Sequence, residues 1–585
     1  MKSSNPTTGA LTGIASSFAR IDATVSRVQF QYWPHSDSTG FAESVEGRPL
    51  QGPTAKIAVK RGRLKMASRS SEGTISLARM AEILGLNVRA LDRARMSRDA
   101  RFDGKFFIAI TSTGIYCRPI CPSPHAKRSH VRYYPSAAAA AAAGYRPCLR
   151  CRPEAAPGTP AWLGTSAVVR RALRLIDEGF LDSESVDELA ERLGIGARHL
   201  HRLFLQHVGA PPIAMAQTRR LHFAKRMIDD TPLPITEIAF AAGFQSIRRF
   251  NSAFHATFGR APRDIRRLRC RTASEDQDEV ILRLAFRPPY DWEQVRDFLA
   301  ARAIPGIESV DAHGYTRTVG TGSGYAVVSV WPIDGEDALA LSVRGAEPAS
   351  LMQLFSAARR VFDVASDPTV IDAAFRSDRI LGPLVKRRLG MRIPGVWTAF
   401  ECAVRAVLGQ QISVAAARTF ASRLVLRAGR AIPTSAAGLT HVFPTASELA
   451  IANLDDLGLT KARIVTLKAL AHAVNAGDVD FATDTELVST ALTALPGIGE
   501  WTAQYTALRA LGEPDAFPAS DLVLRRMASA NSSPLSVSAL QDKAKAWRPW
   551  RAYAAMHLWR AATGECRSGA ARDKGQGGRP GCFVS

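Results

Sequence analysis

The sequence predicts a multidomain, mainly α-helical protein that contains two small α+β domains. Its 585 residues correspond to several domains, because one domain usually has about 100–200 residues. Helical periodicity runs through residues 162–268 and 351–563, whereas β-branched and aromatic runs typical of strands occur at 280–286 and 325–331. Paired cysteines ahead of the first helical region predict a further compact domain.

The domain boundaries follow from changes in composition. Residues 1–95 lack periodicity and are predicted to be a disordered extension or sequence upstream of the natural start, and the Gly-rich residues 564–585 a disordered tail. A Pro- and Ala-rich linker at 153–160 and an acidic break at 272–279 interrupt the chain. The predicted domains are residues 96–153, 162–270, 280–350 and 351–563.

The positive charge of the chain lies in its N-terminal half. Lys and Arg number 76 against 53 Asp and Glu, which gives a net charge of +23. Residues 1–271 carry +21 of this charge and residues 272–585 only +2. This division predicts a polyanion-binding part joined to a part with a different task.

Membrane and secreted proteins are disfavoured by the sequence. No uncharged apolar stretch is long enough to span a membrane, and residues 1–25 lack the pattern of a secretory signal. Eight cysteines in 585 residues are too few for a disulfide scaffold, and four of them fall within 35 residues. We therefore expect a cytoplasmic protein with reduced thiols and one metal site, without membrane contact.

Four cysteines form two close pairs within a basic segment, residues 101–153, of net charge +8. Two pairs of thiolates match the tetrahedral coordination of zinc, so we predict Zn²⁺ at Cys117, Cys121, Cys148 and Cys151. The spacing alone favours a purely structural zinc knuckle, and disulfides or four unrelated core cysteines are further alternatives. The basic surroundings favour contact between a nucleophilic sulfur and a phosphate backbone.

The residues around these cysteines resemble the N-terminal zinc domain of the Ada methylation-response family. The matching strings are RFDG at 101–104, TGIYCRPIC at 113–121 and GYRPCLRC at 144–151. The resemblance implies that Cys117 irreversibly accepts a methyl group from a DNA methyl phosphotriester, while the other three cysteines remain ligands. Methylation would remove negative charge from the site and strengthen DNA binding.

Residues 186–212 and 235–262 repeat each other, and each copy contains a helix, a Gly turn and a second amphipathic helix. This is the pattern of a helix-turn-helix, although a generic helical repeat is an alternative. Polar side chains on the second helices are predicted to contact DNA bases or phosphates; they are Arg198, His199, Arg202, Gln245, Ser246, Arg248, Arg249 and Asn251. Residues 162–270 resemble an AraC-type DNA-binding domain, which implies promoter DNA and RNA polymerase as partners.

The neutral half contains the string LPGIG at 495–499, followed by Asp521. A Pro-Gly-x-Gly hairpin between helices exposes backbone N–H groups that hold a DNA phosphate, so Gly497 and Gly499 are predicted DNA contacts. A carboxylate just beyond the hairpin would face the sugar of the bound nucleotide. An ordinary turn between helices and a capping Asp are the alternatives.

Further segments of this half resemble the AlkA type of 3-methyladenine DNA glycosylase, in the helix-hairpin-helix superfamily. They are RPPYDW at 287–292, LGQQIS at 408–413, FPASD at 517–521 and WRPWRAYA at 547–554. The resemblance spans residues 281–563 and implies an α+β domain like the AlkA N-terminal domain, a helix-hairpin-helix core, and excision of alkylated purines by base flipping.

The resemblance also implies roles for single residues. Asp521 would be the catalytic carboxylate that stabilises positive charge at C1′ and helps water attack. Gln411 would be the wedge that fills the gap left by a flipped base, and three aromatic residues would form the base pocket: Trp501, Tyr505 and Trp559. Aromatic faces attract a cationic alkylated base. Bifunctional relatives carry a Schiff-base Lys at the position of Trp501, so a monofunctional glycosylase is implied.

Together these features predict a nucleoid-associated alkylation-response protein that acts on alkylated double-stranded DNA and on promoter DNA. The competing hypothesis is a non-enzymatic AraC-type regulator with a structural zinc knuckle and a DNA-binding C-terminal half. Asp521 and Trp501 favour the enzyme, because a protein that only binds DNA needs neither an acid beside the hairpin nor an aromatic pocket.

The charge division predicts where salt weakens DNA binding. The binding constant of fragment 1–271 for undamaged duplex should fall more steeply with salt than that of fragment 272–585, because more phosphate contacts release more counterions. Anisotropy titrations over a range of salt concentrations measure both slopes. Equal slopes would contradict this division.

Overall fold

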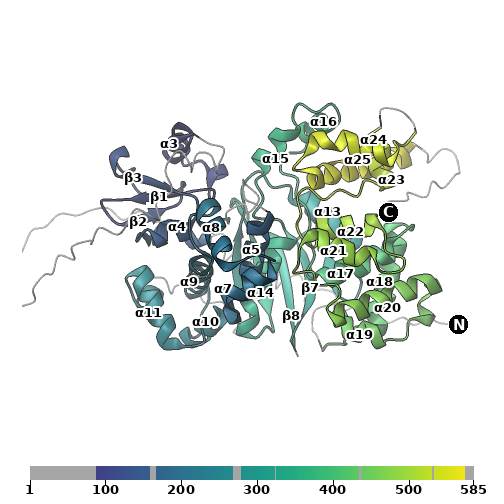
Figure 1. Ribbon diagram of the computed structural model, residues 1–585, viewed down its shortest axis with the longest axis horizontal. Helices are drawn as coiled ribbons and strands as arrows, with labels where there is room; N and C mark the ends of the chain where they lie inside the picture. The colour runs from purple at the N-terminus through teal and green to yellow at the C-terminus, as the bar shows by residue number, and fades with distance from the viewer. Residues whose placement is uncertain are drawn as a thin grey trace, which may run out of the picture. The chain divides into compact units, whose positions relative to one another are not determined.

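The computed structural model describes residues 87–157, 167–267, 279–322, 324–433, 438–529 and 533–572, all within the compact unit Ser70–Ser585. The described residues form two small sheets and many helices, as Figure 1 shows. This arrangement confirms the predicted class, a mainly helical multidomain chain with two α+β parts. Most of the expected extension (residues 1–86) and the end of the expected tail (573–585) lie outside the described residues.

The first sheet is small and carries a helix on each face. Its strands are β1 (Phe107–Ile110), β2 (Ile115–Cys117), β3 (Val131–Tyr134) and β4 (Arg146–Pro147), in the order β3-β1-β2-β4. Successive side chains of a strand point to opposite faces. Ile108 therefore packs with Leu91 of helix α3 (Val88–Ser97), whereas Phe107 packs with Ala138 of helix α4 (Ala137–Ala142).

Helix α3 lies partly in the stretch that was expected to be a disordered extension. Leu91 is fully buried against Phe106 and Ile108, so the folded chain begins before residue 96. The expected linker after residue 153 also starts later than its composition indicates. Pro153–Ala155 form a 3₁₀ turn whose buried Glu154 pairs with Lys225 at 3.4 Å.

Eight helices follow between residues 167 and 267, and they contain both predicted helix-turn-helix copies. They are α5 (Ala167–Glu178), α6 (Phe180–Ser183), α7 (Val186–Arg192), α8 (Ala197–His207), α9 (Pro212–Asp230), α10 (Ile235–Ala241), α11 (Ile247–Phe258) and α12 (Pro262–Arg267). Helix α7 starts with a capping box formed by Ser185 and Glu188. The turns that follow α7 and α10 each contain a left-handed glycine, Gly194 and Gly243.

The second sheet is antiparallel throughout, in the order β5-β9-β8-β7-β6. Its strands are β5 (Glu279–Ala285), β6 (Glu308–Val310), β7 (Tyr315–Thr321), β8 (Gly324–Pro332) and β9 (Ala338–Arg344), with helix α13 (Trp292–Arg302) between the first two. Leu284, Val330 and Leu341 are fully buried and share a core with Val295 of α13.

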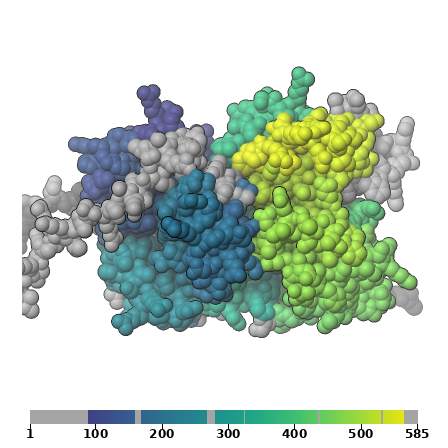
Figure 2. All heavy atoms as spheres, viewed as in Figure 1, coloured from purple at the N-terminus to yellow at the C-terminus, as the bar shows by residue number. Residues whose placement is uncertain are grey.

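After β9 the described chain forms α-helices joined by loops and short 3₁₀ turns. They are α14 (Leu351–Val361), α15 (Pro368–Phe375), α16 (Leu381–Arg387), α17 (Ala399–Gly409), α18 (Val414–Ala428), α19 (Ala446–Ile451), α20 (Lys461–Ala476), α21 (Thr485–Thr493), α22 (Glu500–Arg509), α23 (Leu522–Met527), α24 (Val537–Ala544) and α25 (Arg551–Arg572). In Figure 2 the side chains of α21 to α25, light green to yellow, meet in one continuous surface. Helix α25 runs past residue 563, so the expected tail is helical as far as Arg572.

None of the described helices combines the length and the apolar character that crossing a membrane would require.

Candidate functional sites

The four predicted cysteine ligands come together at one edge of the first sheet. Cys117 ends β2 and Cys148 follows β4, and these strands pair in parallel, with Tyr116 opposite Pro147. The four Sγ atoms all lie within 4.8 Å of one another. Cys121, Cys148 and Cys151 are buried, whereas Cys117 is half-buried.

The donor set of this cluster fits zinc. Four ionised sulfurs this close together, with no cation between them, would repel one another strongly. Four thiolates at this distance therefore need a cation between them, and Zn²⁺ takes four cysteine sulfurs in tetrahedral sites. The donor set therefore fits zinc as the cofactor of this domain, and the four cysteines are the residues that would hold it.

Arg118 connects the cysteine cluster to the buried residues around it. Its backbone N–H donates to Sγ of Cys151 at 3.4 Å, and its side chain donates to the carbonyl of Cys151 at 3.1 Å. The guanidinium also pairs with the carboxylate of Asp103. These contacts stabilise the loop that carries Cys121, and sequence reasoning did not identify Asp103 or Arg118 as partners.

A second site is centred on the carboxylate of Asp521, which is only 1% exposed. Asp521 precedes helix α23, and its Oδ1 accepts from the backbone N–H of Leu524 at 2.9 Å. The indole N–H of Trp501 donates to Oδ2 at 3.0 Å, and that of Trp559 to Oδ1 at 3.3 Å. Burial raises the pKa of Asp521, and these hydrogen bonds oppose the rise by stabilising the ionised form.

The three predicted pocket aromatics lie together beside this carboxylate. Trp501 stacks on Tyr505 with ring centroids 5.1 Å apart and an interplanar angle of 15°. Tyr505 and Trp559 lie 6.1 Å apart and tilted by 60°. All three line a cavity of about 100 Å³. Because both tryptophans contact Asp521 and the cavity, they place the carboxylate next to the aromatic walls.

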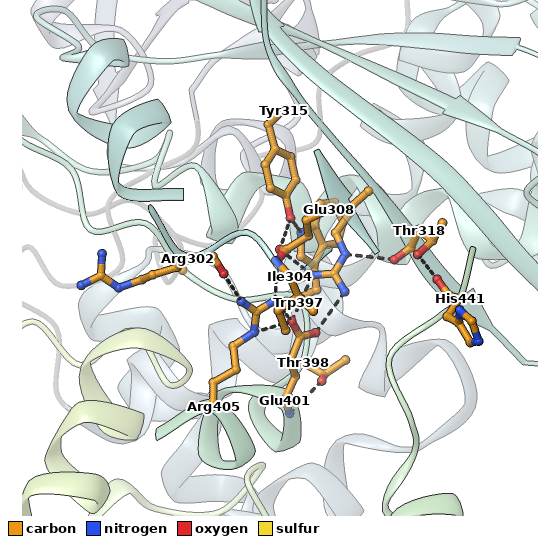
Figure 3. A network of polar contacts seen from close by, with 12 residues as sticks. Arg302, Ile304, Glu308, Tyr315, Thr318, Trp397, Thr398, Glu401, Arg405 and His441 are labelled. Carbon is orange, nitrogen blue, oxygen red and sulfur yellow. Dashed lines mark hydrogen bonds and ion pairs between the residues drawn. The ribbon is translucent and has the colours of Figure 1, made fainter. Parts of the chain in front are cut away.

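Charged side chains from distant segments line the same cavity, and Figure 3 shows them as one network. Glu308 of β6 accepts from Arg405 of α17 at 2.7 Å, and Arg317 of β7 pairs with Glu401 of α17 at 3.1 Å. Burial opposes ionisation, but Arg405 and Arg317 lower the pKa of Glu308 to about 2.

The network joins the second sheet to α17, and Arg405 also donates to the carbonyl of Arg302 at 2.9 Å. Tyr315 donates to Glu308 at 2.7 Å and accepts from the indole of Trp397 at 3.0 Å. Sequence reasoning missed these residues, because they are far apart in the chain and belong to no motif.

The predicted hairpin lies between α21 and α22. Gly497 and Gly499 are exposed on either side of the buried Ile498. Gly497 has φ +77°, and a Cβ there would lie 2.2 Å from Oγ1 of Thr466 on α20, so only glycine fits. Gly499 is the N-cap of α22, and a Cβ there would meet no atom within 4 Å; the N-terminus of a helix is a position where an anion can bind.

Gln411, the predicted wedge, follows α17 and is exposed. Its φ of +58° lies in the left-handed region, which a residue with a Cβ rarely adopts. Strained positions of this kind persist where the surrounding structure holds them.

The predicted DNA contacts of the two helix-turn-helix copies lie on α8 and at α11. Arg198, His199 and Arg202 are exposed on α8, and Arg202 contacts Nδ1 of His199 at 2.8 Å. In the second copy Gln245, Arg248, Arg249 and Asn251 are exposed. Ser246 is half-buried and caps α11 by accepting from the N–H of Arg249 at 3.4 Å.

Three family profiles match consecutive parts of the chain. The profile described as the metal binding domain of Ada matches residues 90–154, that of a helix-turn-helix domain residues 189–268, and that of the AlkA N-terminal domain residues 281–398. They define a protein in which a zinc-binding domain and a helix-turn-helix domain precede an AlkA-like part.

Similar proteins agree with this order. The probable bifunctional transcriptional activator/DNA repair enzyme AlkA of Mycobacterium tuberculosis is 42% identical over 472 residues, covering 80% of this chain and 95% of that protein. DNA-3-methyladenine glycosylase 2 of Escherichia coli is 33% identical, covering 47% of this chain and 95% of that protein. The bifunctional transcriptional activator/DNA repair enzyme Ada of Escherichia coli is 33% identical, covering 29% and 47%. The chain belongs to the family of the bifunctional AlkA proteins.

The hydrogen bonds of Asp521 predict its titration. Trp501→Phe keeps an aromatic ring but removes the N–H donor, so the pKa of Asp521 should rise further above its ordinary value of 3.8. Carboxyl ¹³C NMR of Asp-labelled protein measures this pKa, with the signal assigned by Asp521→Asn. Trp397→Phe is the matched control, because its indole donates to Tyr315 instead. An equal pKa in the Trp501→Phe and Trp397→Phe proteins would contradict the prediction.

Proposed function

We propose that this protein is a DNA glycosylase that excises alkylated purines such as 3-methyladenine, fused to a transcription regulator that accepts methyl groups from DNA phosphotriesters. The observation that carries the glycosylase is the buried carboxylate of Asp521 held between two tryptophans that also line an aromatic cavity. The family of the bifunctional AlkA proteins, to which the chain belongs, supports the combination of repair and regulation.

The proposed reaction begins when the damaged nucleotide leaves the duplex and its base enters the aromatic cavity. Trp501 and Tyr505 stack on one another and attract a base that carries positive charge. The bond between C1′ and the base nitrogen breaks, and its electron pair leaves with the base. Water attacks C1′ through its oxygen and releases one proton to the solvent, while the ionised Asp521 stabilises the positive charge that develops on the sugar.

The same site supports a monofunctional reaction. A bifunctional glycosylase forms a Schiff base between a lysine and C1′. Trp501 stands two residues after the second hairpin glycine, and its indole donates to Asp521 rather than attacking the sugar. Water is therefore the nucleophile that we propose, and strand cleavage is not expected.

Asp521→Asn tests the glycosylase. Asn also caps a helix N-terminus, so α23 should remain folded, but the neutral amide cannot stabilise positive charge. The single-turnover rate of base release from alkylated duplex should fall by about 10²–10³-fold. Asp542→Asn is the matched control, since Asp542 is exposed and pairs only with Lys545 in the described residues. Base release by Asp521→Asn at the unaltered rate would refute the assignment.

Cys117 is the methyl acceptor that we propose in the zinc domain. It is the most accessible of the four ligands, since the other three are buried. Its Sγ attacks the methyl carbon of the phosphotriester; the S–C bond forms as the C–O bond breaks, and the electron pair stays on the phosphate oxygen. With zinc bound, the attacking sulfur stays a thiolate at neutral pH. We further propose that α8 and α11 bind promoter DNA and that the protein recruits RNA polymerase. Both events would take place at the nucleoid, in the cytoplasm.

Mass spectrometry tests the acceptor directly. After incubation with duplex that contains methyl phosphotriesters, the unaltered protein should carry one methyl group per chain on the peptide of Cys117. Cys117→Ser should carry none, whereas Cys402→Ala should be methylated normally, because Cys402 is buried in α17. A methyl group on Cys121, Cys148 or Cys151, or on no cysteine, would reject Cys117 as the acceptor.

A further inference from the structure

Gln410 joins the end of α17 to the hairpin. Its side-chain Nε2 donates to the carbonyl of Gly497 at 2.9 Å and to Oγ1 of Thr502 at 3.0 Å. Its own backbone carbonyl accepts from Arg463 of α20 at 2.6 Å. One residue therefore connects α17, the hairpin, α22 and α20.

The partners of Gln410 are themselves fixed in place. Thr502 is 1% exposed in α22, and Gly497 sits against Thr466 with no room for a Cβ. Gln410 thus contacts a rigid part of the molecule on one side. On its other side it is bonded directly to Gln411, whose exposed side chain rests on a strained left-handed backbone.

We propose that Gln410 is the positioning residue of the wedge: it fixes Gln411 against the phosphate-binding hairpin, so that capture of the phosphate and insertion of the wedge occur as one rigid step. This inference rests on the proposed function, because it takes Gln411 as the residue inserted into the duplex. The amide of Gln410 lies half-buried between the two DNA-contacting elements.

Gln410 does not act through the chemistry of the site. The residues that line the aromatic cavity include its neighbours Gly409 and Ile412 but not Gln410. Asp521 receives its described hydrogen bonds from Leu524, Trp501 and Trp559. Loss of the Gln410 amide should therefore impair insertion into duplex DNA and leave the cavity and the carboxylate intact.

Two substitutions of similar size separate the loss of the hydrogen-bond donor from the effect of an added charge. Gln410→Glu keeps the shape but cannot donate to the carbonyl of Gly497, and Gln410→Met removes the donor without adding a charge. Insertion is measured with 2-aminopurine beside an abasic site in duplex, which needs no chemistry. Both variants should lose about 5- to 10-fold in affinity for this duplex and in the fluorescence rise, as for one lost hydrogen bond.

The base-release assay distinguishes positioning from general damage. Both Gln410 variants should lose about 5- to 10-fold in kcat/KM on alkylated duplex and stay within about two-fold on the same lesion in a single strand, where no gap needs filling. Gln504→Glu is the matched control; its carboxylate can still accept from the N–H of Phe517, and its duplex binding should be unchanged. Gln410→Met should add nothing to Gln411→Ala, because the first residue acts through the second.

Three results would overturn the inference: unchanged duplex binding in both Gln410 variants, a loss confined to Gln410→Glu, or equal losses on duplex and single strand. The second would indicate repulsion between a new charge and the phosphates, and the third a structural defect. Absence of base release by the unaltered protein would instead reject the proposed glycosylase, while the abasic-site measurement would still decide the role of Gln410.

Discussion

The chemistry proposed for the C-terminal half depends on a single buried carboxylate, that of Asp521. Placing the carboxylate of Asp521 away from water is costly, and the fold offsets this cost with three N–H donors from α23, Trp501 and Trp559. Two of the donors are also walls of the aromatic cavity. Two of the groups that donate to the carboxylate are thus also groups that would hold the base.

Another part of the cavity wall is formed by charged side chains that pair with one another. Glu308, Arg317, Glu401 and Arg405 are paired with one another in a buried network between the second sheet and α17. Buried ion-pair networks add little net stability to a protein, but the fold is strongly destabilised when one member is removed. They therefore favour one relative position of the elements that they join. Helix α17 carries Glu401 in its first turn and leads into Gln410 and Gln411 at its end. The network therefore anchors the helix that presents the proposed wedge.

In the zinc domain, exposure distinguishes the proposed methyl acceptor from the other three cysteines. Three buried cysteines and the contacts of Arg118 hold the cluster, and the half-buried Cys117 is left at the surface. Its position at the end of β2, beside the parallel strand β4, brings together two cysteine pairs that are far apart in sequence. A short parallel strand pair is thus enough to bring four cysteine sulfurs into one cluster.

The sequence by itself determined the features that are local: two cysteine pairs, the repeated helix-turn-helix, two of the five strands of the second sheet and the hairpin with its glycines. Short-range spacing and backbone preference specify these elements, so their residues could be named in advance. Only the tertiary structure decided that Trp501 and Trp559, 20 and 38 residues from Asp521, donate to the same carboxylate. It also decided that Glu308 meets Arg405 across 97 residues and that Gln410 reaches the hairpin across 87. Contacts of this kind arise from how helices and sheets pack, and no local pattern encodes them.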